Sequence, residues 1–398
     1  MTPTTAEAQR RLAYFNERRD AIVSTIRELV EIESPSDNKA AVDRMAEAVA
    51  QKFSQLGGSS GIRVHPAKNR GKHLQVDFPG NSAAKPVLLL GHYDTVYPLG
   101  TLAAMPCRVV DNKLTGPGVL DMKSGIALML HALAALQDWH KEDWHKEEWH
   151  RGGLPRPVTV LLVSDEEVGS DSSRAITESL AKKAAAVLVL EPAFGFQGAV
   201  KTARKGVGGY LVKVTGKAAH AGLDSQKGAN AILELARQIE KISSFTDLKK
   251  GLTVNVGVVS GGSRTNVVPA EAAAQVDVRI ARIKDAAGID KKMRSLRPFN
   301  RKCKIEITGG INRPPMERTA GVAALYAQAA AIARELGWKL GEAAVGGGSD
   351  GNFTAALGIP TLDGLGGVGD GAHALHEHIL ISELPRRAAL IAGLIEQA

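Results

Sequence analysis

Residues 86–94 read Pro86-Val-Leu-Leu-Leu-Gly-His-Tyr-Asp94, an apolar run that ends in ionisable side chains. Two later segments repeat this pattern: residues 158–163 lead into Ser164-Asp165-Glu166-Glu167, and residues 185–190 lead directly into Glu191. Each run is short, continuous and rich in β-branched and aliphatic residues, and helix-like segments separate or follow the runs. This pattern is typical of buried parallel strands that are covered on both faces. The sequence therefore predicts an α/β fold.

The pattern of apolar residues along the chain changes twice, near residue 200 and after Arg313. A helix is predicted over residues 6–32, where apolar side chains recur at helical spacing until Ser34-Pro35. From about residue 200 to 311 the strand-like segments nearly alternate instead, with one helical stretch at residues 230–241. After Arg313 the α/β pattern resumes, with a helix near residues 322–336, a strand near residues 359–362 and a final helix from Leu384. We expect a discontinuous α/β domain, residues 1–199 and 312–398, and an inserted α+β domain, residues 200–311.

Composition sets the broad class. The chain has 398 residues, of which 44% are hydrophobic and 23% charged, enough for a sizeable core and two domains. No apolar stretch approaches the roughly 18 to 20 residues that span a bilayer, and the N-terminus lacks the apolar core of a secretory signal. We expect a soluble cytoplasmic protein with no membrane partner. A periplasmic location is the alternative if a leader was removed.

The positive charge is local. The net charge of +8 is modest for this length, and nine Lys or Arg against two Asp fall between Arg282 and Lys304. We interpret this run as a solvated basic helix face rather than a nucleic-acid site. Nucleic-acid binding is the alternative, and it predicts a steep loss of affinity with salt.

A pentapeptide repeat interrupts the first domain. Asp138-Trp-His-Lys-Glu142 recurs at residues 143–147 and in part at residues 148–151. A period of five rotates successive Trp side chains by about 140° around a helix, so they cannot share one narrow stripe. We expect a solvated, exposed extension here rather than a functional site.

Ionisable residues follow each predicted parallel strand. Ligands of open α/β sheets gather at the carboxyl ends of the strands, so His92, Asp94, Glu191 and either Glu166 or Glu167 are expected to converge. Each of these residues alone is more often structural. Together, however, several carboxylates packed without a cation would cost several kcal/mol through repulsion and desolvation, and a divalent cation removes that penalty.

Two further candidates are Asp121, in Gly116-Pro-Gly-Val-Leu-Asp-Met-Lys123, and His373, in Gly371-Ala-His-Ala-Leu-His-Glu377. The cysteines, Cys107 and Cys303, can form neither a stapled scaffold nor a thiolate metal site. Any metal would therefore be held by imidazoles and carboxylates.

Eight short signatures occur in a fixed order along nearly the whole chain. They are Gly91-His-Tyr-Asp-Thr-Val96, Gly118-Val-Leu-Asp-Met-Lys123, Asp165-Glu-Glu-Val-Gly169, Glu191-Pro192, Gly216-Lys-Ala-Ala-His-Ala-Gly222, Asn266-Val-Val-Pro269, Asp277-Val-Arg279 and Gly346-Gly-Gly-Ser-Asp350. In these motifs the chain resembles the di-zinc metallopeptidase and aminoacylase family of glutamate carboxypeptidase, acetylornithine deacetylase and succinyl-diaminopimelate desuccinylase, and most of all its glutamate carboxypeptidase branch.

The resemblance implies a di-zinc exopeptidase-like catalytic sandwich with an inserted lid and dimerisation domain. It also implies two Zn²⁺ per subunit, for which Co²⁺ or Mn²⁺ could substitute. Asp121 would bridge the two ions, with His92 and Glu191 completing one ion and Glu167 and His373 completing the other.

The resemblance also implies the remaining roles. Asp94 would orient His92, and Glu166 would be the general base for a metal-activated water. In the inserted domain the implied substrate contacts are His220 and Asn266 at the oxyanion and Arg279 at the substrate carboxylate. Outside that domain, Arg313 would be a further carboxylate contact and Gly348 would offer backbone close to the substrate.

We expect a zinc-dependent hydrolase that cleaves an amide bond next to a free carboxylate and releases a C-terminal amino acid. Two arginines favour glutamate as that amino acid, and the alternatives are an N-acyl amino acid deacylase of the acetylornithine deacetylase type or a dipeptidase.

A serine hydrolase is the rival chemistry, but no Gly-x-Ser-x-Gly motif occurs and Ser349 has no evident base. A noncatalytic binding module is disfavoured by the intact Asp94 and Glu166. The resemblance further implies a homodimer, and it leaves open whether His220 acts in its own or the neighbouring subunit.

Overall fold

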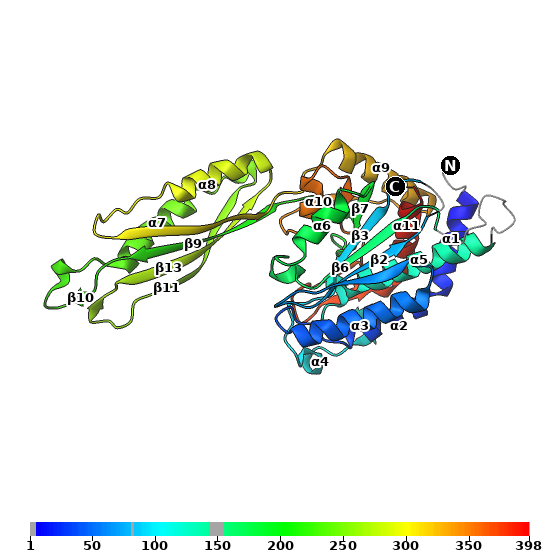
Figure 1. Cartoon of the computed structure of the whole chain (residues 1–398), viewed down its shortest axis with the longest axis horizontal. Coiled ribbons are helices and arrows are strands. Elements are labelled where there is room, and N and C mark those ends of the chain that lie inside the picture. Colours follow the sequence, from blue (N-terminus) through cyan, green and yellow to red (C-terminus); the bar gives the residue numbers. More distant parts are fainter. Residues whose placement is uncertain (1–4, 81–82, 143–153, 398) are drawn as a thin grey trace. The chain divides into compact units, whose positions relative to one another are not determined.

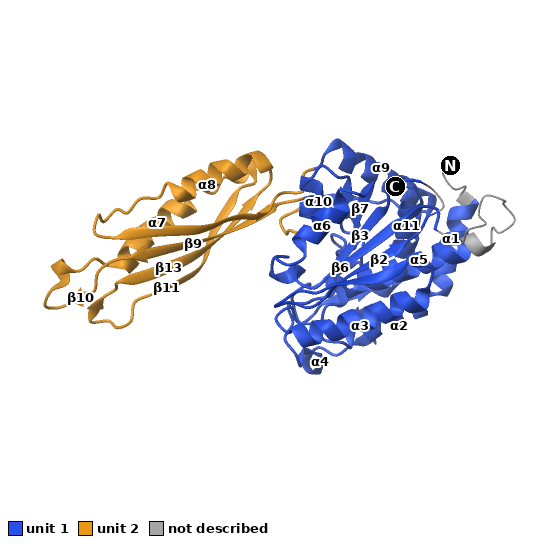
Figure 2. Ribbon diagram, viewed as in Figure 1, with its two compact units in different colours: residues 1–203, 318–344, 349–398 blue, residues 204–317, 345–348 orange. Residues whose placement is uncertain are grey.

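The chain forms two compact units in the computed structural model, which describes residues 5–80, 83–142 and 154–397 (Figure 2). Unit 1 consists of Met1–Ala203, Arg318–Ala344 and Ser349–Ala398, and unit 2 consists of Arg204–Glu317 and Val345–Gly348. The chain enters and leaves unit 2 a few residues later than the expected boundaries at 199/200 and 311/312. The sequence pattern did not anticipate that a second short segment, Val345–Gly348, belongs to unit 2.

Unit 1 is built around a mixed sheet with the strand order β1-β2-β6-β3-β7-β16 (Figure 1). Its strands are β1 (Gly61–His65), β2 (His73–Phe78), β3 (Val87–His92), β6 (Val158–Val163), β7 (Ala186–Val189) and β16 (Thr361–Leu362). The three apolar runs of the sequence form β3, β6 and β7, and β3 pairs in parallel with both of the others. The prediction of buried parallel strands is confirmed.

Helices cover both faces of this sheet. Val87 and Leu89 of β3 belong to a large core formed with α1, α2, α3, α5, α9 and α11, whereas Leu88 and Leu90 belong to a separate core with α6 (Figure 1). The bounds of these helices are α1 (Thr5–Glu17), α2 (Arg19–Val30), α3 (Lys39–Leu56), α5 (Ser124–Glu142), α6 (Arg174–Ala181), α9 (Ala320–Glu335) and α11 (Leu384–Gln397). Because alternate residues of β3 enter different cores, apolar side chains are needed at every position, which explains the continuous runs.

The predicted opening helix is broken. Arg18 separates α1 from α2, with backbone angles of φ −100° and ψ 9° that leave the helical region. No Gly or Pro marks this break in the sequence, so the apolar spacing across residues 6–32 concealed it.

The start of the pentapeptide repeat packs on the core. Trp139 of α5 lies edge-on against Tyr14 and Phe15 of α1, with ring centroids 5.6 and 5.8 Å apart, and the Tyr14 hydroxyl donates to Asp138 Oδ2 at 2.6 Å. The expectation of an exposed extension is therefore wrong for Asp138 and Trp139. Residues 143–153, which hold the later copies, lie outside the described residues.

One segment is longer and more apolar than expected. Among the described residues, Val119–Trp139 has the length and composition to cross a membrane, with a mean hydropathy of 1.5, and 83% of that apolar window is buried inside the protein. The expectation that no stretch has this length was wrong. The burial identifies the segment as a core helix that packs against α11 and α2.

The smaller elements of unit 1 connect the strands and carry the site described below. An antiparallel sheet has the strand order β17-β18-β5-β4, and β8 pairs with β15 where the chain passes between the units. The bounds are α4 (Thr101–Ala104), β4 (Arg108–Val110), β5 (Lys113–Thr115), η1 (Val119–Lys123), η3 (Glu166–Val168), β8 (Val200–Arg204), β15 (Glu342–Val345), α10 (Gly351–Ala356), β17 (Gly369–Asp370), β18 (His378–Leu380) and η7 (Ile381–Glu383).

Unit 2 is an antiparallel sheet with the order β11-β13-β9-β14 and helices on one face. Tyr210, Val212 and Val214 of β9 pack under α7 and α8, and the residues between them face the uncovered side, called the open face below. The bounds are β9 (Gly206–Thr215), β10 (Ala219–His220), η4 (Ser225–Lys227), α7 (Ala231–Ser243), η5 (Leu248–Lys250), β11 (Thr253–Gly261), β12 (Val267–Val268), β13 (Glu271–Ile280), η6 (Ile283–Asp285), α8 (Ala286–Arg294) and β14 (Lys304–Arg313). The basic run includes α8, whose Lys291 and Lys292 are exposed while Met293 is buried.

Candidate metal centre

The predicted metal-ligating residues come from the ends of three neighbouring strands and from two loops. His92 is the last residue of β3, Glu167 lies in η3 directly after β6, and Glu191 follows β7. Asp121 lies in η1, and His373 lies in the loop between β17 and β18. The parallel pairing of β3 with β6 and β7 brings the three strand ends to one edge of the sheet.

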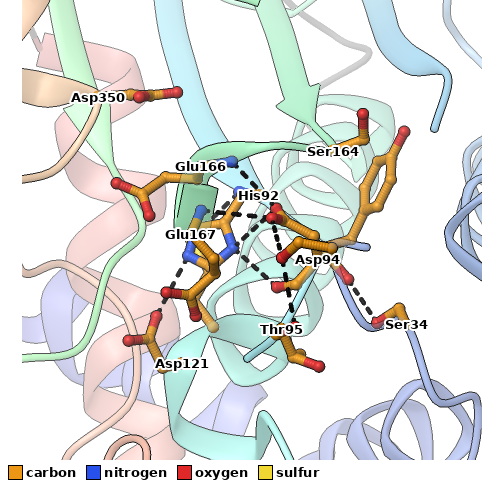
Figure 3. A network of polar contacts seen from close by, with 12 residues as sticks. Ser34, His92, Asp94, Thr95, Asp121, Ser164, Glu166, Glu167 and Asp350 are labelled. Atoms are coloured by element: carbon orange, nitrogen blue, oxygen red, sulfur yellow. Dashed lines mark hydrogen bonds and ion pairs between the residues drawn. The ribbon is translucent and has the colours of Figure 1, made fainter. Parts of the chain in front are cut away.

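Asp121 lies between two imidazoles. Its Oδ1 is 3.2 Å from His92 Nε2 (Figure 3). Its Oδ2 is 3.4 Å from His373 Nε2. His92 Nε2 is also 3.3 Å from Glu191 Oε1, and His373 Nε2 is 3.2 Å from Glu167 Oε2. Each oxygen of Asp121 thus faces a different histidine and carboxylate pair.

These contacts define two groups that share one carboxylate. His92, Asp121 and Glu191 form what we call the strand half-site, and Asp121, Glu167 and His373 form the loop half-site. Within each group the potential ligand atoms lie within 4.8 Å of one another. Imidazole nitrogen with carboxylate oxygen is the donor set of catalytic zinc sites, and neither group uses a thiolate.

The electrostatics of both groups favour cations. Burial lowers the pKa of His92, but hydrogen bonds to Asp121, Asp94 and Glu191 outweigh it and raise that pKa well above its usual value. Hydrogen bonds to Asp121 and Glu167 raise the pKa of His373 to about 10. The carboxylates therefore draw positive charge to one position beside each imidazole, where a divalent cation can take the place of a proton.

Glu167 supplies a second indication that the residues fit metal ions. Burial raises the pKa of its carboxyl group, and its Oε1 is buried without a hydrogen-bond partner in the part of the chain that the structure describes. An orphaned buried carboxylate oxygen is costly unless a cation or proton meets it. A metal in the loop half-site would satisfy it.

Asp94 is fully buried and organises the neighbouring residues (Figure 3). His92 Nδ1 is 3.0 Å from the Asp94 main-chain oxygen and 3.4 Å from its Oδ1, so Nδ1 donates to Asp94 and Nε2 is the atom that a metal in the strand half-site would bind in place of a proton. The backbone N–H groups of Glu166 and Glu167 also donate to the Asp94 carboxylate, each at 3.3 Å. Ser36 Oγ, which the sequence did not single out, donates to Asp94 Oδ2 at 2.7 Å.

Glu166 belongs to neither half-site. It precedes Glu167 in η3, and Figure 3 shows its side chain among the labelled residues grouped around His92. The strand-end pattern left Glu166 and Glu167 interchangeable as ligands, and the family resemblance implied Glu167. The structure places only Glu167 in a ligand group.

The whole chain resembles known peptidases. Residues 88–397 match the family described as peptidase family M20/M25/M40. The chain is also 32% identical over 387 residues to carboxypeptidase G2 of Pseudomonas sp. (strain RS-16), which covers 94% of this chain and 88% of that protein. This chain belongs to the M20/M25/M40 peptidase family. It is a metal-dependent hydrolase, as the sequence predicts.

Solved structures share the fold of this M20 peptidase. An M20 family metallo-carboxypeptidase from Sulfolobus solfataricus aligns with a TM-score of 0.72 at 17% identity, covering 94% of this chain and 98% of that chain. A dinuclear metal-binding M20 peptidase from Bacillus subtilis aligns with a TM-score of 0.66 at 13% identity, covering 96% and 98%. The predicted α/β architecture with an inserted α+β unit is confirmed.

Unit 2 of this M20 peptidase brings His220 and Asn266 together. β10 pairs with β12 so that His220 lies opposite Val267, and the Asn266 carbonyl accepts from the Ala221 N–H at 2.9 Å. The backbone N–H groups of Gly222 and Leu223 donate to His220 Nδ1 at 3.2 and 3.1 Å. Because Nδ1 is an acceptor, the neutral imidazole carries its proton on Nε2, which is exposed as a donor.

Arg279 and Arg313 lie at the same register position of the unit 2 sheet. Arg279 of β13 and Arg313 of β14 are both in register with Val207 of β9, from opposite sides. Asp277 holds the Arg279 Nε at 2.9 and 3.1 Å, whereas the Arg313 residue is only 6% exposed. A hollow of about 570 Å³ is lined by Val207, Asp277 and Asn312, among others of unit 2.

Gly348 and Ser349 are both held by side chains. Arg204 Nη1 donates to the carbonyl groups of Gly347 and Gly348, each at 3.2 Å. Ser349 is fully buried and its Oγ donates to Asp363 Oδ2 at 2.5 Å. A buried hydroxyl bonded to a carboxylate lacks the histidine that a serine nucleophile needs.

Proposed function

We propose that this M20 peptidase is a zinc-dependent carboxypeptidase that hydrolyses an amide bond next to a free C-terminal carboxylate and releases glutamate. The observation that carries this proposal is the position of Asp121, whose two oxygens face two separate histidine and carboxylate pairs. A carboxylate in that position suits a pair of metal ions that share it. The name of carboxypeptidase G2 and the dinuclear metal of the Bacillus subtilis relative support the same reading.

Two Zn²⁺ would be held by the strand half-site and the loop half-site, with Co²⁺ or Mn²⁺ as substitutes. When bound, the ions would lower the pKa of a water molecule and polarise the scissile carbonyl group. The protein contributes pre-formed ligands, because Asp94 fixes His92 in the tautomer whose Nε2 can donate its lone pair.

Glu166 would be the general base. It would accept a proton from the attacking water and pass that proton to the departing nitrogen, so no acyl-enzyme is required. Its backbone is held by the same buried Asp94 that orients His92, which supports a fixed distance between base and ligand. The adjacent Glu167 cannot take this role while it serves as a ligand.

Unit 2 would bind and orient the substrate. The Nε2–H of His220, fixed as a donor by Gly222 and Leu223, would stabilise the developing oxyanion with Asn266 beside it. The backbone at Gly348 would contact the substrate.

Arg279 and Arg313 would bind the carboxylates of the released amino acid. Their backbone positions flank β9, about two strand spacings or ~10 Å apart, and their side chains can converge from there. Guanidinium groups suit bidentate carboxylate binding, and two of them favour an acidic amino acid. An N-acyl amino acid deacylase or a dipeptidase is the second candidate, because it would use the same metal ligands.

A substrate panel tests the proposal. N-Acyl glutamate should react faster than N-acyl leucine, N-acetylornithine and dipeptides, and amidation of the α-carboxylate should nearly abolish turnover. Arg279→Gln should raise KM by roughly 10- to 100-fold, the loss of a charged hydrogen bond, while kcat changes less. Lys213→Gln on the same open face is the matched control, because Lys213 is exposed on β9. Equal rates on acid and amide would refute carboxylate recognition, and preference for N-acetylornithine would favour the deacylase.

We also propose a homodimer formed through unit 2. β11 is an edge strand of its sheet, and Val258 and Val259 on it are 52% and 56% exposed. Sedimentation should give twice the monomer mass.

Mixing His220→Ala with Glu166→Gln tests whether His220 acts in the neighbouring subunit, because exchanged heterodimers would regain one site with both native residues. Confirmed exchange without regained activity would mean that His220 acts within its own chain or not at all.

A further inference from the structure

Glu377 is a fully buried carboxylate that no role above uses. Its Oε1 accepts from the backbone N–H groups of Leu120 at 2.7 Å and Asp121 at 2.9 Å, and its Oε2 accepts from the Gly118 N–H at 3.0 Å. One side chain therefore binds three N–H groups in the segment that carries the shared ligand Asp121.

The backbone of this segment is irregular. The backbone angles of Asp121 and Met122 are not helical, so regular helical hydrogen bonding does not continue through η1. Gly118 has a φ of 72°, and a Cβ there would lie 2.6 Å from Thr95 Cγ2, so the backbone also approaches its neighbours closely. Buried N–H groups without an acceptor are costly, and the Glu377 carboxylate is the acceptor for three of them.

The backbone of Glu377 is itself tied to His373. The Ala374 N–H donates to the Gly371 carbonyl at 2.9 Å, and the Glu377 N–H donates to the Ala374 carbonyl at 3.0 Å. The Tyr97 hydroxyl donates to the same Ala374 carbonyl at 3.0 Å. These bonds make residues 371–377 a compact double turn, with the ligand near its start and the carboxylate at its end.

We propose that Glu377 is a positioning residue that fixes Asp121 relative to His373 and thereby sets the metal affinity of the loop half-site. The inference rests on the two-metal function proposed above. His92 and Glu191 lie at the ends of β3 and β7, where the sheet holds them. The three backbone N–H groups that Glu377 binds belong to Gly118, Leu120 and Asp121 and not to these two ligands. The strand half-site should therefore depend on Glu377 less than the loop half-site does.

Metal titration of the full-length, metal-free protein tests this role without reference to activity. Zn²⁺ affinities would be measured by calorimetry, and Co²⁺ would report each site by its visible absorption. Glu377→Ala should weaken one ion by about 10- to 100-fold, as for other partners that orient metal ligands, and leave the second ion nearly unchanged. Glu377→Gln, which keeps one acceptor oxygen, should fall between Ala and wild type. The Co²⁺ band lost should be the band that His373→Ala loses.

Glu234 of unit 2 offers a matched control. It is 2% exposed, and its carboxylate accepts from the backbone N–H groups of Phe299 and Asn300 at 2.9 and 2.8 Å. Glu234→Ala removes a comparable buried acceptor, so it should lower the unfolding midpoint without changing either metal affinity.

The outcomes separate the two claims. Wild-type protein that binds fewer than two ions contradicts the proposed two-metal function. Two ions in wild type with unchanged affinities in Glu377→Ala would overturn the positioning role alone, as would equal weakening of both ions or an equal effect of Glu234→Ala. If Glu377→Ala does not fold, Glu377→Gln decides: unchanged affinities in it overturn the role, and selective weakening supports it.

Discussion

The two half-sites share Asp121 but differ in what holds their other ligands. His92 and Glu191 stand at the ends of sheet strands, and their side chains are 2% and 9% exposed. Glu167 and His373 stand in a short turn and a loop, and the His373 side chain is 51% exposed. Ligands on strands are fixed by the ladder that also holds the core, whereas ligands on loops depend on a few local hydrogen bonds. We therefore expect the strand half-site to bind its ion more tightly.

Removing the shared ligand should abolish the difference between the half-sites. Asp121→Ala takes one oxygen from each group, so both ions should be lost at micromolar metal. Activity should fall by roughly 10⁴-fold or more, because the contributions of the ions to catalysis are lost with them. Elemental analysis after gel filtration measures the metal content. Retention of one ion at full occupancy would show that Asp121 is not shared.

Replacing the proposed base should stop turnover without changing the metal affinity of either half-site. Glu166→Gln preserves shape and removes the proton acceptor, so kcat should fall by about 10²- to 10⁴-fold. Both metal affinities should stay as in wild type, since Glu166 is in neither ligand group. Full activity of the metal-loaded variant would exclude Glu166 as the base.

Two variants, each lacking one ligand of a different half-site, should show that the half-sites differ in metal affinity. His373→Ala should weaken a single ion by roughly 100-fold or more, since a direct ligand matters at least as much as the partners that orient it. His92→Ala should weaken the ion that wild-type protein binds more tightly. Competition with a chelator gives both affinities. Equal affinities of the two ions in wild-type protein, or loss of the same ion in both variants, would contradict the claim that the strand half-site binds its ion more tightly.

The smallest expected effect is a loss of folding stability at acid pH that does not depend on bound metal, and we assign it to His131. Burial lowers the pKa of His131 to about 4, against a value near 6.5 in unfolded chains. Between these values the unfolded chain binds more protons than the folded chain, so stability falls as pH falls, by up to about 1.4 kcal/mol per pH unit. His131→Gln should remove this slope and keep a partner for Thr25 Oγ1, which lies 3.0 Å from the ring. Urea unfolding of metal-free protein at pH 7 and pH 5 measures it, and an unchanged slope would contradict the assignment to His131.

Sequence patterns predict the strands of the sheet and the ligands at their ends, but not the contacts that loops make with one another. The apolar runs predict β3, β6 and β7 because burial on both faces requires apolar residues at every position. The same logic places His92 and Glu191 together, because the ends of parallel strands adjoin. Asp121 and His373 lie in glycine-containing segments that no periodicity could place, so they were further candidates only, and the family resemblance then implied their roles as ligands.

Contacts between distant loops left no local signal. Glu377 lies four residues after His373 within a segment that the sequence singled out, yet its partners at Gly118 and Asp121 are more than 250 residues away. Trp139 likewise reads as part of a polar repeat, and only its contact with α1 reveals it as a packed residue. In both cases tertiary packing, rather than local pattern, decides the role of the side chain.

The backbone of His373 has a consequence for how this position evolves. Its φ of 64° is left-handed, a conformation that costs a residue with a Cβ roughly 1–2 kcal/mol more than it costs glycine. Glycine at this position would stabilise the metal-free fold by up to about 1 kcal/mol and at the same time delete a ligand. Selection for abundance and selection for turnover therefore oppose each other here. A lineage that lost its need for the second ion should drift from histidine to glycine at this residue sooner than His92, where no such strain exists, changes at all.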